Sequence, residues 1–164
     1  MIAPLDLPAP LVRTLDRLSL AAGGLDGPWW IFGSAAMRLM GAADIEAEDV
    51  DLLLGQGDAE RLAARLGAAR IEGAGERFRS AYFAKARTDD LRIEIMSGLE
   101  VRTAEGWRRV SPRTRTLAAW EPHPLPLPDR EELIEICRLF GRPKDIARAA
   151  MLEQLSGRPF LPPA

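Results

Sequence analysis

Two hydrophobic periods follow one another along the first third of this chain. Leucines recur three to four positions apart over residues 9–22, a spacing typical of an amphipathic helix, and Gly23-Gly24 ends the pattern. The apolar run WWIF (29–32) predicts a strand, because its large residues have high strand propensity and a glycine follows them. The same reasoning predicts a short helix at 34–43 with Ser34 as its N-cap, a strand at 48–54 and a helix at 58–68.

The middle of the chain changes to a period of two, and the end returns to a helical period. Alternation predicts strands at 77–87 and 91–96, followed by a hairpin at 100–110 with its turn at Glu105-Gly106. A proline-rich segment, 121–128, is expected to be an extended connector. Helices are predicted at 130–140 and 143–155. This order predicts an α/β (α+β) fold in which helices flank a mixed β-sheet.

The length of 164 residues fits one domain, with a core at about 28–110 and a C-terminal helical part at about 129–156. The net charge of −2 argues against a protein that coats nucleic acid non-specifically. We find no apolar stretch near the ~20 residues that a membrane span requires, so we expect no membrane partner. The single cysteine, Cys137, lies in an apolar helical pattern and is expected to be a buried thiol. A cytoplasmic protein fits these features.

Carboxylates mark the strands predicted at 48–54 and 91–96. Asp49 and Asp51 lie two apart on the first strand, so both side chains point to one face. Glu94 is the polar position between apolar neighbours on the second. If the two strands are adjacent, three oxygen donors converge, which is the ligand type that Mg²⁺ requires. The alternative is a solvated face of a half-exposed sheet.

Gly33-Ser34 provides a second candidate feature upstream of these acids. A strand ends there in glycine and a helix begins with serine, an arrangement that directs free N–H groups and a positive dipole end at an approaching anion. Glycine allows a phosphate close to the backbone, and serine can donate a further hydrogen bond. The turn and the three acids together predict a site for a metal-bound phosphate.

The chain resembles the DNA polymerase β-type nucleotidyltransferase superfamily. The resemblance spans roughly residues 28–155 and rests on four segments: FGSAAMRLMG (32–41), DVDLLL (49–54), RIEIM (92–96) and GRPKDIARAAMLEQL (141–155). The helix that ends near "LMG" and the closing helix are similar to those of small antibiotic (lincosamide/aminoglycoside-type) nucleotidyltransferases and of abortive-infection nucleotidyltransferase toxins. The resemblance implies a nucleotidyltransferase fold and transfer of a nucleoside monophosphate from an NTP.

The resemblance also implies roles for individual residues. Asp49 and Asp51 would hold two Mg²⁺ ions, with Mn²⁺ as a possible substitute, and Glu94 would bind one ion and help to remove the acceptor proton. Gly33 and Ser34 would hold the triphosphate tail. Lys144 would reach a phosphate, and Asp145 would orient Lys144 or an arginine. The alternative for Lys144 and Asp145 is the first turn of a helix that starts after Pro143.

One departure from the family pattern leaves the function open between two classes. Related enzymes carry a basic residue and a threonine before the paired aspartates, whereas this chain has Asp44, Glu46 and Glu48 there. Compensating positive charge is expected from four residues on neighbouring strands: Arg77, Arg79, Lys85 and Arg92. We therefore expect either a nucleotidyltransferase, with a small-molecule or RNA acceptor, or a catalytically degenerate binding or toxin-antitoxin module. The nucleotide and the oligomeric state stay open.

Overall fold

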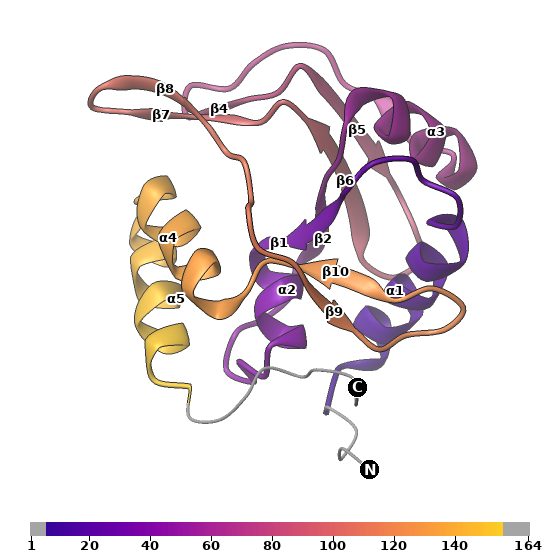
Figure 1. Ribbon diagram of the computed structural model, residues 1–164, viewed down its shortest axis with the longest axis horizontal. Helices are drawn as coiled ribbons and strands as arrows, with labels where there is room; N and C mark the ends of the chain where they lie inside the picture. Colours follow the sequence, from indigo (N-terminus) through magenta and orange to yellow (C-terminus); the bar gives the residue numbers. More distant parts are fainter. Residues whose placement is uncertain (1–5, 156–164) are drawn as a thin grey trace.

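A five-stranded mixed sheet forms the centre of the computed structural model, which describes residues 6–155 (Figure 1). The ends of the expected domain, 1–5 and 156–164, lie outside the described residues. The strand order is β1-β2-β6-β5-β3; β2 and β6 run parallel, and the other neighbours are antiparallel. The strands are β1 (Trp30–Phe32), β2 (Asp49–Leu53), β3 (Ala69–Arg70), β5 (Tyr82–Ala86) and β6 (Arg92–Ser97).

Two smaller sheets and five helices complete the described part of the chain. The small sheets have the orders β4-β7-β8 and β10-β9, with strands β4 (Phe78–Arg79), β7 (Glu100–Thr103), β8 (Gly106–Arg109), β9 (Thr116–Ala118) and β10 (Leu125–Leu127). The helices are α1 (Ala9–Ala21), α2 (Gly33–Leu39), α3 (Gln56–Leu66), α4 (Arg130–Phe140) and α5 (Pro143–Glu153). Within residues 6–155, no helix combines the length and the apolar character that crossing a membrane would need. The expected α/β (α+β) architecture is confirmed.

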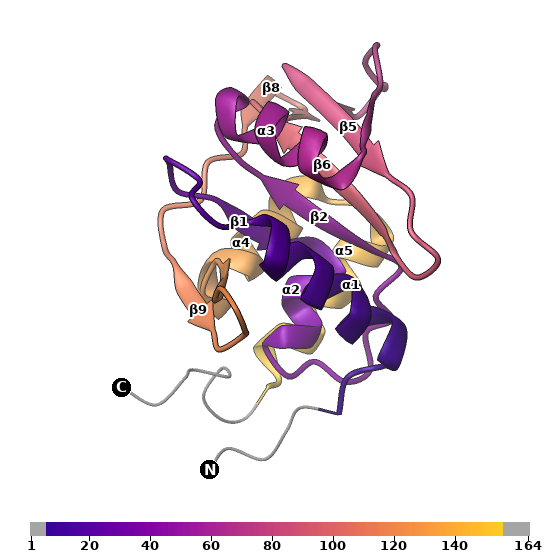
Figure 2. The ribbon, with the colours of Figure 1, turned by 90° about the vertical axis from the view of Figure 1, so that its right-hand side faces the viewer.

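The central sheet has two unlike faces because its strands alternate. One face carries fully buried aliphatic residues, including Val50, Ile93 and Ile95, and packs against α1 and α3 (Figure 2). The other face carries the acidic residues of β2 and β6 and, beside them, a second buried cluster that contains Met96 and Phe140. Helices α4 and α5 lie on this second side (Figure 1). The sheet therefore places the candidate site between its polar face and the C-terminal helix pair.

The C-terminal helix pair forms where the sequence predicted it, because both of its helix starts carry strong signals. Asp129 caps α4 by accepting a hydrogen bond from the Glu132 N–H, and α4 ends at Gly141 in the left-handed conformation, with φ +70°. Pro143 then occupies the first turn of α5, where its missing N–H costs nothing.

Two local predictions are wrong. The strand expected at 77–87 is divided into β4 and β5, which belong to different sheets. The neighbouring chain bends at Gly98, whose φ of +64° separates β6 from β7, and Ala81 packs so closely that a Cβ at Gly98 would lie 3.0 Å from its Cβ. The helix after β1 begins at Gly33 with Phe32 at the N-cap position, so Ser34 is not the cap.

Short strands were missed because they carry no detectable period of their own. The segment expected to be a connector contains β10, which includes Pro126 and pairs with β9. Strand β3 was also missed, since its two residues carry no detectable period and pair with β5. A short strand that carries no period of its own is specified by its partner strand, so the sequence gives little local signal for it.

Candidate functional site

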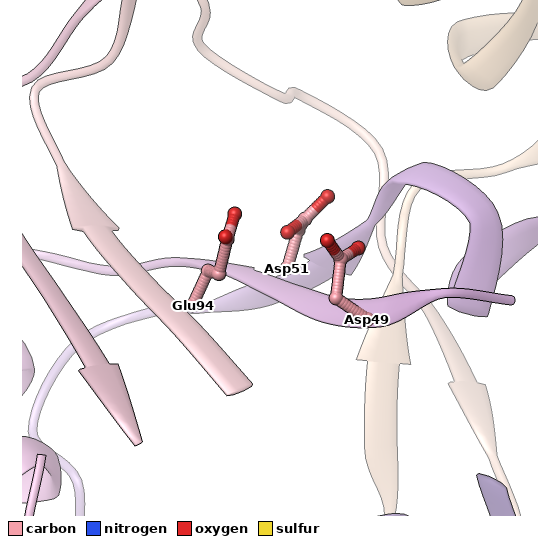
Figure 3. Close-up of side chains that lie close together, drawn as sticks. All are labelled: Asp49, Asp51 and Glu94. Atoms are coloured by element: carbon pink, nitrogen blue, oxygen red, sulfur yellow. The ribbon is translucent and has the colours of Figure 1, made fainter. Parts of the chain in front are cut away.

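The carboxylates of Asp49, Asp51 and Glu94 converge on one face of the central sheet. Residues 49 and 51 are two apart on β2, and the parallel register places Glu94 of β6 directly beside Asp51. One carboxylate oxygen from each residue can be chosen so that all three lie within 4.8 Å of one another. Figure 3 shows the three side chains on the same side of the two strands. This separation is well inside the roughly 8 Å beyond which two carboxylates cannot share a metal ion of ordinary bond lengths.

The proximity of these acids opposes their ionisation. Burial, and then the charges of Asp49 and Glu94, hold the pKa of Asp51 well above its ordinary value. Burial and the charge of Glu94 also raise the pKa of Asp49. Oδ1 of Asp51 is buried and has no hydrogen-bond partner among the described residues. A buried acceptor without a partner and with excess negative charge around it is the environment that a bound cation would satisfy.

Position 33 requires glycine because of its backbone conformation and the close approach of the Asp51 carboxylate. The φ of Gly33 is +69°, a conformation that side chains other than glycine rarely adopt, and a Cβ there would lie 2.8 Å from Oδ2 of Asp51. The absence of a side chain thus lets the Asp51 carboxylate approach the start of α2. Ser34 follows and is 4% exposed, and both residues line the same cavity as the acids. Their contact with a phosphate stays a prediction.

Two of the four basic residues expected on neighbouring strands lie beside the acids. Arg92 is 3.9 Å from Asp49 and 3.5 Å from Glu94, and Lys85 is 3.5 Å from Glu94. Arg77 instead donates to the carbonyl of Phe140, and Arg79 pairs with Glu100. Arg92 and Lys85 therefore offset part of the negative charge at the Glu94 end of the site.

A cavity of about 480 Å³ separates the acids from helices α4 and α5. Lys144 and Arg148 line it from α5, four residues apart and so on one helix face. Burial raises the pKa of both aspartates, and the charges of Lys144 on Asp49 and of Arg148 on Asp51 offset a small part of that rise. Arg148 was missed in the sequence, although its spacing from Lys144 was the signal that could have identified it.

Asp145 orients an arginine, which was one of the two expected roles. Its buried carboxylate accepts hydrogen bonds from Nε of Arg142 at 2.6 Å and Nη2 at 3.1 Å, and from the Arg142 backbone N–H. The Arg142 guanidinium also lies 4.9 Å from the ring centre of Phe78 and 5.9 Å from that of Phe140. Asp145 thus fixes a positive charge in the cavity wall and closes the first turn of α5.

The Cys137 thiol lines the cavity but is not suited to act as a nucleophile there. Cys137 lines the cavity but is 2% exposed, and burial raises the pKa of its thiol to about 12. A thiol with that pKa stays protonated at neutral pH and is a poor nucleophile. The expectation of a buried, unreactive thiol is therefore supported.

Comparison with solved structures identifies the fold. A proposed nucleotidyltransferase from Thermotoga maritima superposes with a TM-score of 0.70 at 18% identity, over 90% of this chain and 94% of that one. The antibiotic-resistance factor ANT(2″)-Ia, in complex with adenylyl-2″-tobramycin, gives 0.55 at 17% identity over 88% of each chain. An antigenic nucleotidyltransferase-like protein from Paracoccidioides brasiliensis gives 0.51 at 18% identity, over 93% of this chain and 81% of that one.

The chain therefore has the nucleotidyltransferase fold, as the sequence motifs implied. The sequence matches no protein-family model and no curated protein. Structural similarity at these identities concerns the fold alone.

Proposed function

We propose that the protein is a metal-dependent nucleotidyltransferase, which moves a nucleoside monophosphate from an NTP to a hydroxyl or phosphate acceptor and releases pyrophosphate. The observation that carries this proposal is the convergence of Asp49, Asp51 and Glu94 within 4.8 Å, on adjacent strands of this fold. A cytoplasmic location, where nucleoside triphosphates are available, fits the proposal.

The donor set suits a hard divalent cation. Three carboxylates, with an unpartnered buried oxygen on Asp51, are ligands for Mg²⁺ or Mn²⁺ and leave positions for water and phosphate. A pair of such ions supplies Lewis-acid chemistry, by activating the attacking hydroxyl and stabilising the leaving pyrophosphate.

The chain's own residues provide the remaining functions. The Glu94 carboxylate accepts the proton of the acceptor hydroxyl, since it is the outermost acid toward β5. Lys144 and Arg148 offset the negative charge of the triphosphate from α5, and Gly33-Ser34 contacts its tail. The Lys144 and Arg148 side chains thus supply the positive charge that, in the family pattern, comes from a basic residue before the paired aspartates.

Replacement of Asp51 by asparagine tests the proposal through two effects of opposite sign. The Asp51→Asn variant removes one of three repelling charges, so the free energy of unfolding without metal should rise by about 0.5–2 kcal/mol. In the unmodified protein, Mg²⁺ with the preferred NTP at 100 times its Kd should add about 2.7 kcal/mol, or roughly 5–10 °C in melting temperature. The variant should lose this increase, and with it pyrophosphate release.

The matched control is Asp89→Asn, a charge removal at an exposed residue that does not line the cavity. It should change neither the free energy of unfolding without metal nor the stabilisation by Mg²⁺ with NTP. Thermal unfolding with Mg²⁺ or Mn²⁺ and each of the four NTPs provides the measurement. A protein that no metal–nucleotide pair stabilises would contradict the proposal.

One observation favours a second candidate, a nucleotide-binding module without catalysis. Glu48 lines the cavity and its charge raises the pKa of Asp49, while Asp44 and Glu46 remain exposed on the same loop. This extra negative charge opposes the approach of a triphosphate. Stabilisation by nucleotide without release of pyrophosphate, for any acceptor hydroxyl tested, would favour the binding module.

A further inference from the structure

The cavity has a charged end and an apolar end. Phe83 and Met96 are cross-strand partners, two residues beyond Lys85 and Glu94 on the same face of the sheet. Phe78, Phe83 and Ile136 are half-buried and line the cavity, and Ile71 at its edge is 43% exposed. We call the wall formed by Ile71, Phe78, Phe83, Ile136 and Phe140 the apolar recess. Large apolar side chains left accessible around one concavity are typical of a ligand site.

The strand order places the acids between the apolar recess and the Gly33-Ser34 turn. That turn follows β1, the acids lie on β2 and β6, and Phe83 lies on β5, in the order β1-β2-β6-β5. In nucleotidyl transfer the acceptor oxygen forms a bond to the α-phosphorus while the bond from that phosphorus to the bridging oxygen of pyrophosphate breaks. The acceptor oxygen and the leaving pyrophosphate lie on opposite sides of the α-phosphorus, in line with each other. If pyrophosphate leaves toward Gly33-Ser34, the acceptor enters from the opposite side, where Glu94 and the apolar recess lie. Glu94 then takes the proton of the acceptor hydroxyl.

The charges around the apolar recess disfavour a cation. Among the described residues, every carboxylate that lines the recess side of the cavity has a basic partner: Glu72 is paired with Arg70, Asp145 with Arg142, and Glu94 with Lys85 and Arg92. Glu48 lies at the other end, just before β2. The Arg142 guanidinium lies against Phe78 and Phe140, and its charge is balanced by Asp145. Lys144 and Arg148 line the same cavity and form no ion pair with any described residue, so the surplus charge on the α5 side of the recess is positive. An acceptor with several ammonium groups would find repulsion there and no unpaired carboxylate.

We propose, on the basis of the proposed nucleotidyltransferase function, that the apolar recess binds the body of the acceptor. The acceptor is an uncharged or anionic small molecule in which an aromatic or alkyl body carries the reactive hydroxyl. This chemistry differs from the tobramycin whose adenylyl derivative is bound in the structurally similar ANT(2″)-Ia. Aromatic side chains recognise the body, and the surplus positive charge of Lys144 and Arg148 disfavours a cationic acceptor.

Three probes that share one phenol ring but differ in charge test the inference. They are tyrosol (neutral), 4-hydroxyphenylacetate (anionic) and tyramine (cationic), with tobramycin as the polycation. Dissociation constants are measured by ligand-observed NMR on the full-length protein. Tyrosol and 4-hydroxyphenylacetate should bind at least about tenfold more tightly than tyramine. The Phe83→Ala variant should weaken their binding by about tenfold and leave the shift in melting temperature by Mg²⁺ with NTP unchanged.

The control is Leu117→Ala, which removes an exposed apolar side chain outside the cavity and should have no effect. Tighter binding of tyramine or tobramycin would overturn the inference. A Phe83→Ala variant that loses the nucleotide response but retains probe binding would also overturn it, because the recess would then hold the nucleobase. A normal nucleotide response without binding of the neutral and anionic probes would overturn this inference alone. Absence of any metal–nucleotide response would overturn the proposed function, and the acceptor assignment with it.

Discussion

At the scale of single residues, Gly33 determines how closely the Asp51 carboxylate can approach the start of α2. Its backbone is in the left-handed region, and the Asp51 carboxylate occupies the space where a Cβ would be. A side chain at this position would therefore act twice, through backbone strain and through displacement of a candidate metal ligand.

The Gly33→Ala variant should lower the free energy of unfolding by about 1–3 kcal/mol, because alanine at this φ is strained. It should also reduce the stabilisation by Mg²⁺ with NTP, since Asp51 has to move. Gly41→Ala separates the two effects. Gly41 has φ +105° with no atom within 4 Å of an added Cβ, so its replacement strains the backbone alone. Equal loss of the nucleotide response in both variants, measured by thermal unfolding, would argue against a specific role for the approach of Asp51.

The sequence predicted which three carboxylates form the acidic cluster, but it could not predict the strand pairing that brings them together. The period of two placed Asp49 and Asp51 on one face, because side-chain alternation is local. The pairing of Glu94 with Asp51 depends on parallel register between strands that are distant in the chain, so the sequence could state it only as a condition. Gly33 was predicted for a phosphate contact, whereas the structure shows a steric reason involving Asp51.

At the scale of elements, Glu132 connects α4 to the segment before β9. Its 5% exposed carboxylate accepts hydrogen bonds from the backbone N–H groups of Arg113 and Thr114 and from the Thr114 hydroxyl. Although burial opposes ionisation, these hydrogen bonds and Arg113 together lower the pKa of Glu132. This interaction fixes the segment before β9, which forms no strand and whose structure could not be predicted from sequence periodicity.

Because the folded-state pKa of Glu132 is lowered, its stabilisation is present above the ordinary glutamate pKa. That stabilisation is lost as the pH falls through the lowered folded value. The Glu132→Gln variant should lose about 1–3 kcal/mol at pH 7, since glutamine cannot accept all of these hydrogen bonds. The difference from the unmodified protein should narrow in acid. Urea unfolding at several pH values measures it. Glu135→Gln, which alters an exposed ion pair to the same Arg113, should change stability by less than about 0.5 kcal/mol at any pH.

Helix boundaries in the C-terminal pair were predicted well, whereas the strand at 77–87 was not. Asp129, Gly141 and Pro143 are local signals that end or begin helices wherever they occur. The division of 77–87 accompanies the bend at Gly98 between its partner strands β6 and β7, which no alternation within 77–87 could reveal.

At the scale of the whole molecule, the two hydrophobic clusters differ in what they connect. The larger cluster joins the sheet to α1 and α3 and also contains residues of α4 and α5, whereas the smaller one joins Phe140, at the end of α4, to β6 and β7 beside the candidate site. Phe140 is central to the smaller cluster, since its ring meets Phe78 edge-on at 4.9 Å and its carbonyl accepts from Arg77.

Phe140→Ala should therefore lower the free energy of unfolding by about 3–5 kcal/mol and reduce stabilisation by Mg²⁺ with NTP, because Phe140 ends α4 just before the start of α5, which carries Lys144. Leu62→Ala, in the larger cluster and fully buried on α3, should destabilise by about 2–5 kcal/mol but retain the nucleotide response. Chemical denaturation with and without nucleotide distinguishes them. Retention of the response in Phe140→Ala would show that the helix pair is not needed for nucleotide binding.

The parallel pairing of β2 and β6 has a consequence for how the protein folds. The chain between them has to leave the sheet and return through α3 and β5 before residue 94 reaches residue 51, so this contact closes a long loop and is intrinsically slow. The same closure brings three like charges together. If the proposed divalent cation is present during synthesis, it would offset that repulsion at the barrier, so new chains should mature faster when metal is supplied, before any substrate is bound.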